Sequence, residues 1–382
     1  MRRIIEWFVF LVLLATVNGM MAADAGIAAV LADLVKEKKI VGAQFAFGSG
    51  NDEPKAGVTG TDSPATGQQV REDTLFCIGS CSKPLASAMT FRLIQSGRLE
   101  LTDAVDRWLP EFSNPKLSSG KSAARPPNLS ELLSHRAGIY SQRNRLTPEQ
   151  VNLIRDFTQT LDQSVSGISH QPLLGPPGRQ YAYSGAGYVV LGGIIERAGS
   201  GALEDQLQML LCQPLKMNNT TWFPNRRQNR AAAGGVILNR QLKPNPQTPH
   251  LTGARPKFPL VGGSLYSTAI DLSKFCQMIL GRGTLGKTRV MNEQTWRQWV
   301  SKPFSQNYGY GWQLIQNPSG GIVGLSHGGS LASSRALIRV NLETKRYCVA
   351  VYTLTTASEV KSPQSAGNQI ARAAVVTVGA AK

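Results

Sequence analysis

After a separate N-terminal segment, the chain shows two hydrophobic periodicities in succession. Residues 24–38 carry apolar side chains such as Ile27 and Leu31 at the three- and four-residue spacing of a helix. Residues 41–47 then alternate in the manner of a half-buried strand, and residues 57–60 predict a second strand after a polar turn. The pattern therefore predicts a helix followed by a pair of strands.

The middle of the chain has a mainly helical pattern, interrupted by Pro- and Gly-rich loops. Residues 80–97 predict an amphipathic helix that ends at Gly97, with Pro84 in the first turn, where its missing N–H costs little. Further predicted helices lie at residues 101–109, 128–135, 148–165, 187–200 and 268–281. At the end of the chain, strand patterns return at residues 321–326, 334–340 and 347–354, and residues 365–379 predict a terminal helix.

Strand-forming sequence thus lies at both ends of the chain, with helices between. This arrangement predicts an α+β fold in which residues 24–75 and 315–382 build one antiparallel sheet, flanked by the N- and C-terminal helices. The helical residues from about 80 to 310 form a second lobe. The cleft between the two lobes is the expected place for a site.

The first 23 residues have the pattern of a targeting segment. Basic Arg2 and Arg3 precede an apolar run over residues 4–17, which contains one acidic residue, Glu6, and small residues follow. This order predicts a secretory signal peptide and export to the periplasm or the extracellular space. An uncleaved membrane tether is the alternative, although the run is short for a span of about 20 residues.

The chain is strongly basic, with 41 Lys and Arg against 24 Asp and Glu and a net charge of +17. The basic residues are scattered, and the densest stretch, residues 226–230, lacks interleaved aromatic residues. No nucleic-acid recognition module is visible, so specific nucleic-acid binding is not expected. An anionic envelope polymer or membrane surface is a possible partner, with general solubility as the alternative.

Five cysteines lie far apart in apolar surroundings: Cys77, Cys81, Cys212, Cys276 and Cys348. Their number is odd, and their spacing matches neither a metal site nor a disulfide framework. We expect them to be small buried hydrophobic side chains. Nothing in the spacing of His, Cys, Asp and Glu suggests a metal site, and no cofactor is expected.

The most informative motif is Ser80-Cys81-Ser82-Lys83, where an extended run turns helical. Residues three apart on a helix lie on the same face, so Ser80 and Lys83 are expected to be neighbours. If Lys83 is buried, its ammonium loses hydration and the amine can become a proton acceptor. Lys83 could then activate the Ser80 hydroxyl as a nucleophile.

Further segments, in order along the chain, carry a resemblance to a known family. Residues 76–83 resemble the nucleophile segment of the serine β-lactamase and penicillin-binding protein superfamily, in the class C-related branch that also includes carboxylesterases, D-aminopeptidases and DD-peptidases. The other matching segments are residues 132–139, which begin Leu-Leu-Ser-His, residues 177–178 with Tyr-Ala-Tyr-Ser-Gly at 181–185, residues 262–272, Tyr-Gly-Tyr-Gly-Trp at 308–312 and Ser-His-Gly-Gly-Ser at 326–330. The resemblance spans about residues 25 to 355 and implies a β-lactamase/transpeptidase-like fold.

The resemblance also implies an acyl-enzyme mechanism. Ser80 would attack a carbonyl carbon, and Lys83 and Tyr183 would share the proton transfers. Whether Lys83 or Tyr183 removes the serine proton stays open at this point.

The same resemblance assigns roles to the backbone on the other side of the cleft. The N–H groups of Ser80 and Ser330 would form the oxyanion hole. Gly328 and Gly329 would let the substrate lie close to the strand edge. His135, in the Leu-Leu-Ser-His segment, is expected to form a structural hydrogen bond.

Two positions depart from the family pattern and bear on the substrate. Gly185 stands where members that recognise a peptide-like amide carry Asn, and His327 stands where true β-lactamases carry a Lys that pairs with the substrate carboxylate. A histidine is only partly charged near neutral pH. Both changes weaken recognition of a carboxylated β-lactam or D-Ala-D-Ala terminus. Arg335, which closely follows the motif, is a candidate replacement cation.

The residues together predict a cofactor-free serine hydrolase that acts on a small molecule or short peptide. A carboxylic ester, a small amide or a D-peptide ranks first as the substrate. A β-lactamase or DD-peptidase acting on cell-wall-type substrates is the alternative. An envelope binding protein without turnover is a further alternative, which Gly185 keeps open and the intact set of Ser80, Lys83 and Tyr183 argues against.

Overall fold

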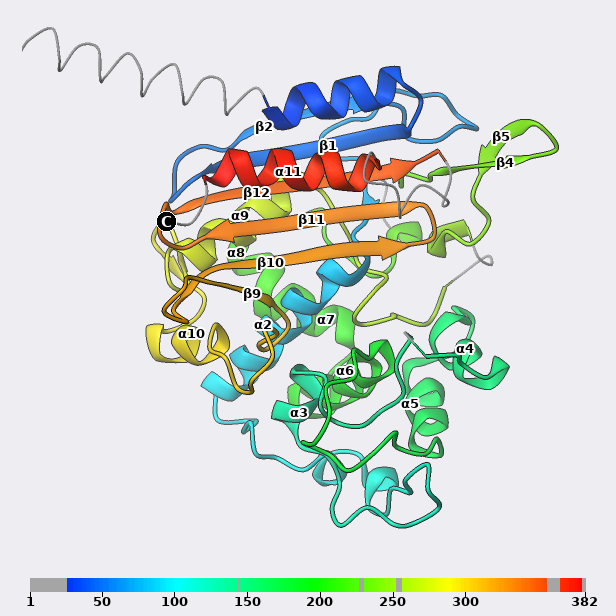
Figure 1. Ribbon diagram of the computed structural model, residues 1–382, viewed down its shortest axis with the longest axis vertical. Helices are drawn as coiled ribbons and strands as arrows, with labels where there is room; N and C mark the ends of the chain where they lie inside the picture. The colour runs from blue at the N-terminus through cyan, green and yellow to red at the C-terminus, as the bar shows by residue number, and fades with distance from the viewer. Residues whose placement is uncertain (1–25, 143, 227–229, 252–255, 356–364, 380–382) are drawn as a thin grey trace, which may run out of the picture.

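Figure 1 shows the computed structural model, which describes residues 26–142, 144–226, 230–251, 256–355 and 365–379. The predicted signal peptide lies outside these residues. The centre is a six-stranded sheet in which each strand is antiparallel to its neighbours. The strand order is β2 (Lys55–Gly60), β1 (Ile40–Ser49), β12 (Arg346–Leu354), β11 (Ser334–Asn341), β10 (Ile322–Leu331) and β9 (Gln313–Gln316).

Helices cover both faces of this sheet. One face packs against the helical residues 26–36 and against α11 (Ala366–Val378), through side chains that include Ile27, Tyr352 and Ile370. The other face packs against α9 (Ala269–Leu280), which contacts β1, β11 and β12. The antiparallel sheet between terminal helices and a mainly helical region confirms the predicted fold class.

The region between the sheet strands contains the remaining helices and three small two-stranded sheets. The α-helices are α2 (Ser82–Gln95), α3 (Leu129–Leu133), α4 (Pro148–Arg155), α5 (Leu161–Ser169), α6 (Gly185–Gly199), α7 (Leu203–Leu207), α8 (Gln213–Leu215) and α10 (Glu293–Trp299). The small sheets pair β3 (Phe76–Cys77) with β6 (Tyr266–Ser267), β4 (Gly235–Leu238) with β5 (Gln241–Pro244), and β7 (Thr284–Leu285) with β8 (Thr288–Arg289). In the described part of the chain, no helix is long and apolar enough to cross a membrane.

The helical region departs from the sequence prediction at two places. Residues 101–109 form turns and a short 3-10 helix (Val105–Arg107) in place of one α-helix. The predicted helix over residues 148–165 is two helices, because the backbone is extended at Asp156 and Thr160 caps the start of α5. A hydroxyl that accepts a backbone hydrogen bond starts a new helix there, although the apolar spacing continues.

Helix α2 is buried on almost every side, so the prediction of an amphipathic helix is wrong. All residues from Ser82 to Phe91 are buried, because the helix runs between the sheet and the other helices. Its polar side chains bond to the backbone: Ser87 Oγ donates to Tyr310 O at 2.8 Å. The helix does end near Gly97, whose φ of 72° is in the left-handed region that favours glycine.

The turn before α2 packs backbone to backbone against β10. This turn is the 3-10 helix η1 (Gly79–Cys81), and Gly79 has a φ of 53°. A Cβ on Gly79 would overlap the backbone nitrogen of Ser330, and a Cβ on Gly329 would overlap the carbonyl oxygen of Ile78. Two glycines that are far apart in the sequence therefore allow the helix start to contact the strand directly.

All five cysteines are buried and free, as the sequence predicts. Burial raises the pKa of the Cys77 thiol to about 12 and also raises the pKa of Cys81. The Sγ of Cys81 lies 3.1 Å from the carbonyl oxygen of His327, which adds a contact between the helix start and β10. Thiols with raised pKa values carry little thiolate and are poor nucleophiles.

We expect Gly329→Ala to lower the melting temperature, because its Cβ would push β10 away from Ile78. Overpacking of this kind costs about 1–3 kcal/mol. Gly328→Ala is a matched control on the same strand, since an added Cβ there meets nothing within 4 Å. Thermal unfolding of both variants measures the difference, and equal melting temperatures would contradict a tight contact between η1 and β10.

Candidate active site

The site lies where η1 and the start of α2 face the edge of β10. Ser80 is half-buried in η1, and Lys83 follows one turn later. The Lys83 Nζ is 3.5 Å from the Ser80 Oγ and donates a hydrogen bond of 2.7 Å to the carbonyl oxygen of Gly262. The structure thus brings Ser80 and Lys83 together.

Lys83 is 1% exposed, and burial lowers the pKa of its amine to about 7. No carboxylate of the described residues pairs with it. The rings of Tyr183 and Tyr188 lie instead 4.6 Å and 5.3 Å from its Nζ. A substantial neutral fraction therefore exists near neutral pH, and this neutral amine can accept a proton.

Tyr183 is positioned by the residues that begin helix α6. Ser184 caps the helix: its Oγ accepts a hydrogen bond from Gly187 N and donates one to Tyr140 O. The hydroxyl of Ser141 donates to the carbonyl oxygen of Tyr183 at 2.6 Å. The backbone is therefore held on both sides of Tyr183, with its ring next to the Lys83 amine.

His135 forms the structural hydrogen bond that the sequence predicts. Its Nδ1 accepts a hydrogen bond of 3.1 Å from Ser184 N, and its ring lies 4.3 Å from the Tyr183 ring. An accepting Nδ1 places the proton of the neutral imidazole on Nε2. His135 thus supports the backbone that carries Tyr183.

His327 does not have the partial charge that the sequence suggests. Its side chain is 2% exposed, and burial, together with the nearby Lys83, lowers the pKa of the imidazole to about 3. Its Nδ1 lies 2.9 Å from the carbonyl oxygen of Gly328, which can only accept, so Nδ1 carries the proton. The Nε2 then accepts from the Tyr308 hydroxyl at 3.0 Å. His327 is a neutral, fully bonded side chain and cannot replace a lysine as a cation.

The register of β10 and β11 directs the Ser330 N–H toward the cleft. The strands are joined by a two-residue loop, which makes Leu331 and Ser334 a hydrogen-bonded pair. Pairs alternate in an antiparallel ladder, so Ser330 and Arg335 form a pair without mutual hydrogen bonds, and the Ser330 N–H faces away from β11. On that side β9 pairs only as far as Ser326. The edge at Ser330 is therefore open beside Ser80.

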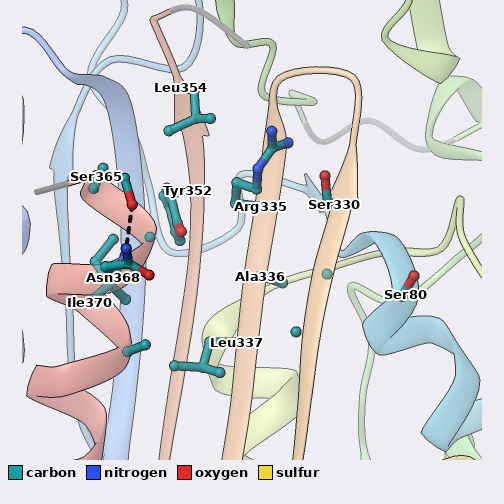
Figure 2. Close-up of a pocket in the computed structure, with 15 residues that line it drawn as sticks. Ser80, Ser330, Arg335, Ala336, Leu337, Tyr352, Leu354, Ser365, Asn368 and Ile370 are labelled. Carbon is teal, nitrogen blue, oxygen red and sulfur yellow. Dashed lines mark hydrogen bonds between the residues drawn. The ribbon is translucent and has the colours of Figure 1, made fainter. Parts of the chain in front are cut away.

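Two adjoining cavities lie between β10, β11 and helix α11, and they share Gly328, Leu337 and Ala371. The first, shown in Figure 2, has a volume of about 330 Å³ and is lined by residues that include Ser80 and Ser330. The second has a volume of about 390 Å³, and its lining includes Tyr183, His327 and Arg339. Together they form a groove that passes both candidate catalytic side chains at the strand edge.

Gly185 begins helix α6, and the space beside it is occupied by a residue that sequence reasoning missed. A Cβ on Gly185 would overlap the side-chain nitrogen of Gln142. The Gln142 Oε1 accepts a hydrogen bond of 2.7 Å from the Gly185 N. The carboxamide of Gln142 therefore lies where a side chain at position 185 would begin. No sequence signal identifies this residue, because the contact joins a loop to a helix start 43 residues away.

Among the described residues, no group of His, Cys, Asp and Glu is arranged to hold a metal ion. The polar side chains in the groove are serines, tyrosines, amides, arginines and His327, and none of its described lining residues is Asp or Glu. Ser80, Lys83 and Tyr183 are the candidate proton-transferring groups that the structure brings together here.

Comparison with known proteins places the chain in a family. The chain matches the family described as Beta-lactamase over residues 27–374, and it belongs to this family. It is 30% identical over 245 residues to an uncharacterized protein of Mycobacterium tuberculosis, a match that covers 60% of each chain. It is 32% identical over 199 residues to Esterase EstB of Burkholderia gladioli, with 50% of this chain and 49% of the esterase covered. The match thus spans only about half to three-fifths of these relatives.

Solved structures agree with the fold. EstCE1, a hydrolase with promiscuous acyltransferase activity, has a TM-score of 0.77 at 21% identity and covers 93% of this chain and 99% of its own. A class C beta-lactamase has a TM-score of 0.72 at 16% identity and covers 94% and 97%. These similarities confirm the predicted β-lactamase/transpeptidase-like fold.

We expect the rate of ester hydrolysis to rise with pH through about 7, where Lys83 loses its proton. Below this pH the protonated amine cannot accept the Ser80 proton, so kcat/KM should fall about tenfold per pH unit. A pH profile of kcat/KM measures this decline on the acidic side, the acidic limb of the profile. His327→Gln is the control: the pKa of His327 is about 3, so the limb should keep its position. A limb that disappears in His327→Gln would contradict the assignment to Lys83.

Proposed function

We propose that this protein is a serine hydrolase that cleaves carboxylic esters or small amides through an acyl-enzyme on Ser80. The observation that carries this proposal is the contact of 3.5 Å between the Ser80 Oγ and the buried Lys83 Nζ. Burial lowers the pKa of the lysine, so the amine beside the hydroxyl can take its proton. A purely structural lysine would keep its charge in water or in an ion pair.

The reaction follows from the positions of these groups. As Ser80 Oγ bonds to the carbonyl carbon, its proton passes to the Lys83–Tyr183 pair, and the carbonyl oxygen becomes an oxyanion. The N–H groups of Ser80 and Ser330 stabilise this oxyanion, and removal of one such donor typically costs about 3 kcal/mol. The pair then protonates the leaving group. Water repeats the sequence on the acyl-enzyme and frees Ser80.

The polar groups favour an ester or small amide over a β-lactam. The buried, neutral His327 offers no cation to a carboxylate on the leaving group. Gly185 has no side chain that could donate to a peptide-like amide. The named activity of the relative Esterase EstB agrees with this preference. Other relatives are named as putative D-alanyl-D-alanine carboxypeptidases, so short peptides remain part of the substrate class.

The decisive test is hydrolysis of a short-chain p-nitrophenyl ester by the purified protein and by Ser80→Ala. We expect turnover by the wild-type protein and a fall to the uncatalysed background in the variant, because the acyl-enzyme needs the Ser80 Oγ. Tyr183→Phe should retain the fold and lose at least about tenfold in kcat, as general acid–base groups contribute about 10²–10⁴-fold. Turnover that persists in Ser80→Ala would refute the mechanism.

We also propose that the protein is exported, on the strength of the basic start and the apolar run at residues 4–17. Expression of the full chain in a bacterial host, followed by mass spectrometry of the intact protein, measures processing. We expect a mature N-terminus between residues 19 and 24. A protein that retains residue 1 would favour a membrane tether instead. An exported protein of net charge +17 would meet anionic envelope polymers or membrane surfaces.

A further inference from the structure

Arg335 is a buried cation without a counterion in the described part of the chain. Its side chain is 8% exposed, and its Nη1 donates to the carbonyl oxygens of Ala332 and Ser334 at 2.9 Å and 2.8 Å. No described carboxylate pairs with the guanidinium. A buried charge is normally paired, because its lost hydration is costly. An anion supplied from outside the chain would offset that cost.

Arg335 lines the cavity that opens onto the nucleophile. It lies directly opposite Ser330 in the β10–β11 ladder, and both residues line the 330 Å³ cavity together with Ser80 (Figure 2). Most of the remaining lining is apolar, with side chains that include Ala336, Leu337, Tyr352, Leu354, Ala366 and Ile370. The cavity thus combines an apolar wall, one cation and an opening at Ser80.

Tyr352 supplies a second hydrogen-bond donor beside this cation. It pairs with Arg335 in the β11–β12 ladder and lines the same cavity. Within the described residues its hydroxyl makes no hydrogen bond. Burial raises the pKa of Tyr352 to about 12, so the hydroxyl keeps its proton and can donate it to an anion. Both residues thus line the same cavity.

The reaction geometry directs the acyl part of the substrate into this cavity. The leaving group takes its proton from the Lys83–Tyr183 pair and therefore lies toward the second cavity, which Tyr183 lines. The acyl carbon is bonded to Ser80, with its oxygen toward the Ser330 N–H. The cavity lined by Ser80, Ser330 and Arg335 is then available to the acyl chain.

We propose that the acyl chain of the substrate ends in a carboxylate, which Arg335 binds. This inference rests on the proposed hydrolase function and narrows its substrate to monoesters or monoamides of dicarboxylic acids. The apolar wall contacts the methylene groups of the chain, while Arg335 and Tyr352 hold its terminal carboxylate. Ser80 attacks the esterified carbonyl, and water releases the free dicarboxylic acid.

Arg339 defines the competing arrangement. It lies on the same face of β11 and lines the second cavity with Tyr183, and its buried Nε makes no hydrogen bond among the described residues. A substrate with its anion on the leaving group would use Arg339 in place of Arg335. Substitution of each arginine in turn therefore shows whether the acyl part or the leaving group of the substrate carries the charge.

The test compares p-nitrophenyl monoesters of linear dicarboxylic acids with neutral p-nitrophenyl esters of matched chain length. The wild-type protein should prefer the carboxylated series at one chain length, as measured by kcat/KM. Arg335→Gln should reduce this preference about ten- to a hundredfold, since a charged hydrogen bond contributes about 1.5–3 kcal/mol. Arg339→Gln, the matched control, should change the preference less than about twofold.

The outcomes separate the inference from the proposed function. If hydrolysis depends on Ser80 but Arg335→Gln keeps the preference for carboxylated esters, the carboxylate site is overturned. The proposed hydrolase function is then still supported. If only Arg339→Gln loses the preference for carboxylated esters, the site at Arg335 is overturned, and the charge is assigned to the leaving group. Melting temperatures of both variants show whether either change acts through the fold.

If no ester is turned over, a binding measurement tests the carboxylate site directly. Adipate should bind to Ser80→Ala in calorimetry, and Arg335→Gln in that background should abolish the signal while Arg339→Gln preserves it. Hexanamide, which carries no carboxylate, is the neutral control for affinity. Equal binding of adipate to all three proteins overturns the proposal regardless of the hydrolase result.

Discussion

The contact between the Gly79 turn and strand β10 sets the geometry of the whole site. Ser80 belongs to η1, the turn before α2, whereas Ser330 belongs to the sheet, so their two N–H groups converge only if these elements touch. Glycines at 79 and 329 remove the side chains that would keep the backbones apart. Because backbone atoms cannot change rotamer to relieve a clash, this contact allows little variation in the distance between nucleophile and oxyanion hole.

Desolvation is the second constraint, and it lowers the pKa of two basic side chains. Lys83 and His327 are both almost fully buried, so the protein favours the neutral form of each. For Lys83 this creates a proton acceptor beside Ser80. For His327 it removes a cation that the sequence position suggests. Burial is therefore the largest cause of both pKa shifts, ahead of the nearby charges.

Local patterns predicted much of the architecture because they depend on neighbours in the sequence. The strands at both ends and the one-turn spacing of Ser80 and Lys83 follow from residue periodicity alone. The predictions failed where distant groups decide. Helix α2 is buried all round because other elements surround it, and Gln142 lies beside Gly185 through a loop that no periodicity describes. The charge state of His327 depends on burial by Tyr308 and the helix start.

The sequence by itself determined the strands and helices at both ends of the chain, its mainly helical middle, the family and the identity of the candidate nucleophile, lysine and tyrosine. Those features are encoded by residue types at fixed spacings. Only the tertiary structure decided that Lys83 is buried without a carboxylate, that His327 is neutral, and that Arg335 faces the cavity beside Ser80. Burial and contact between distant residues shift proton affinities and shape cavities, and both exist only once the chain has folded.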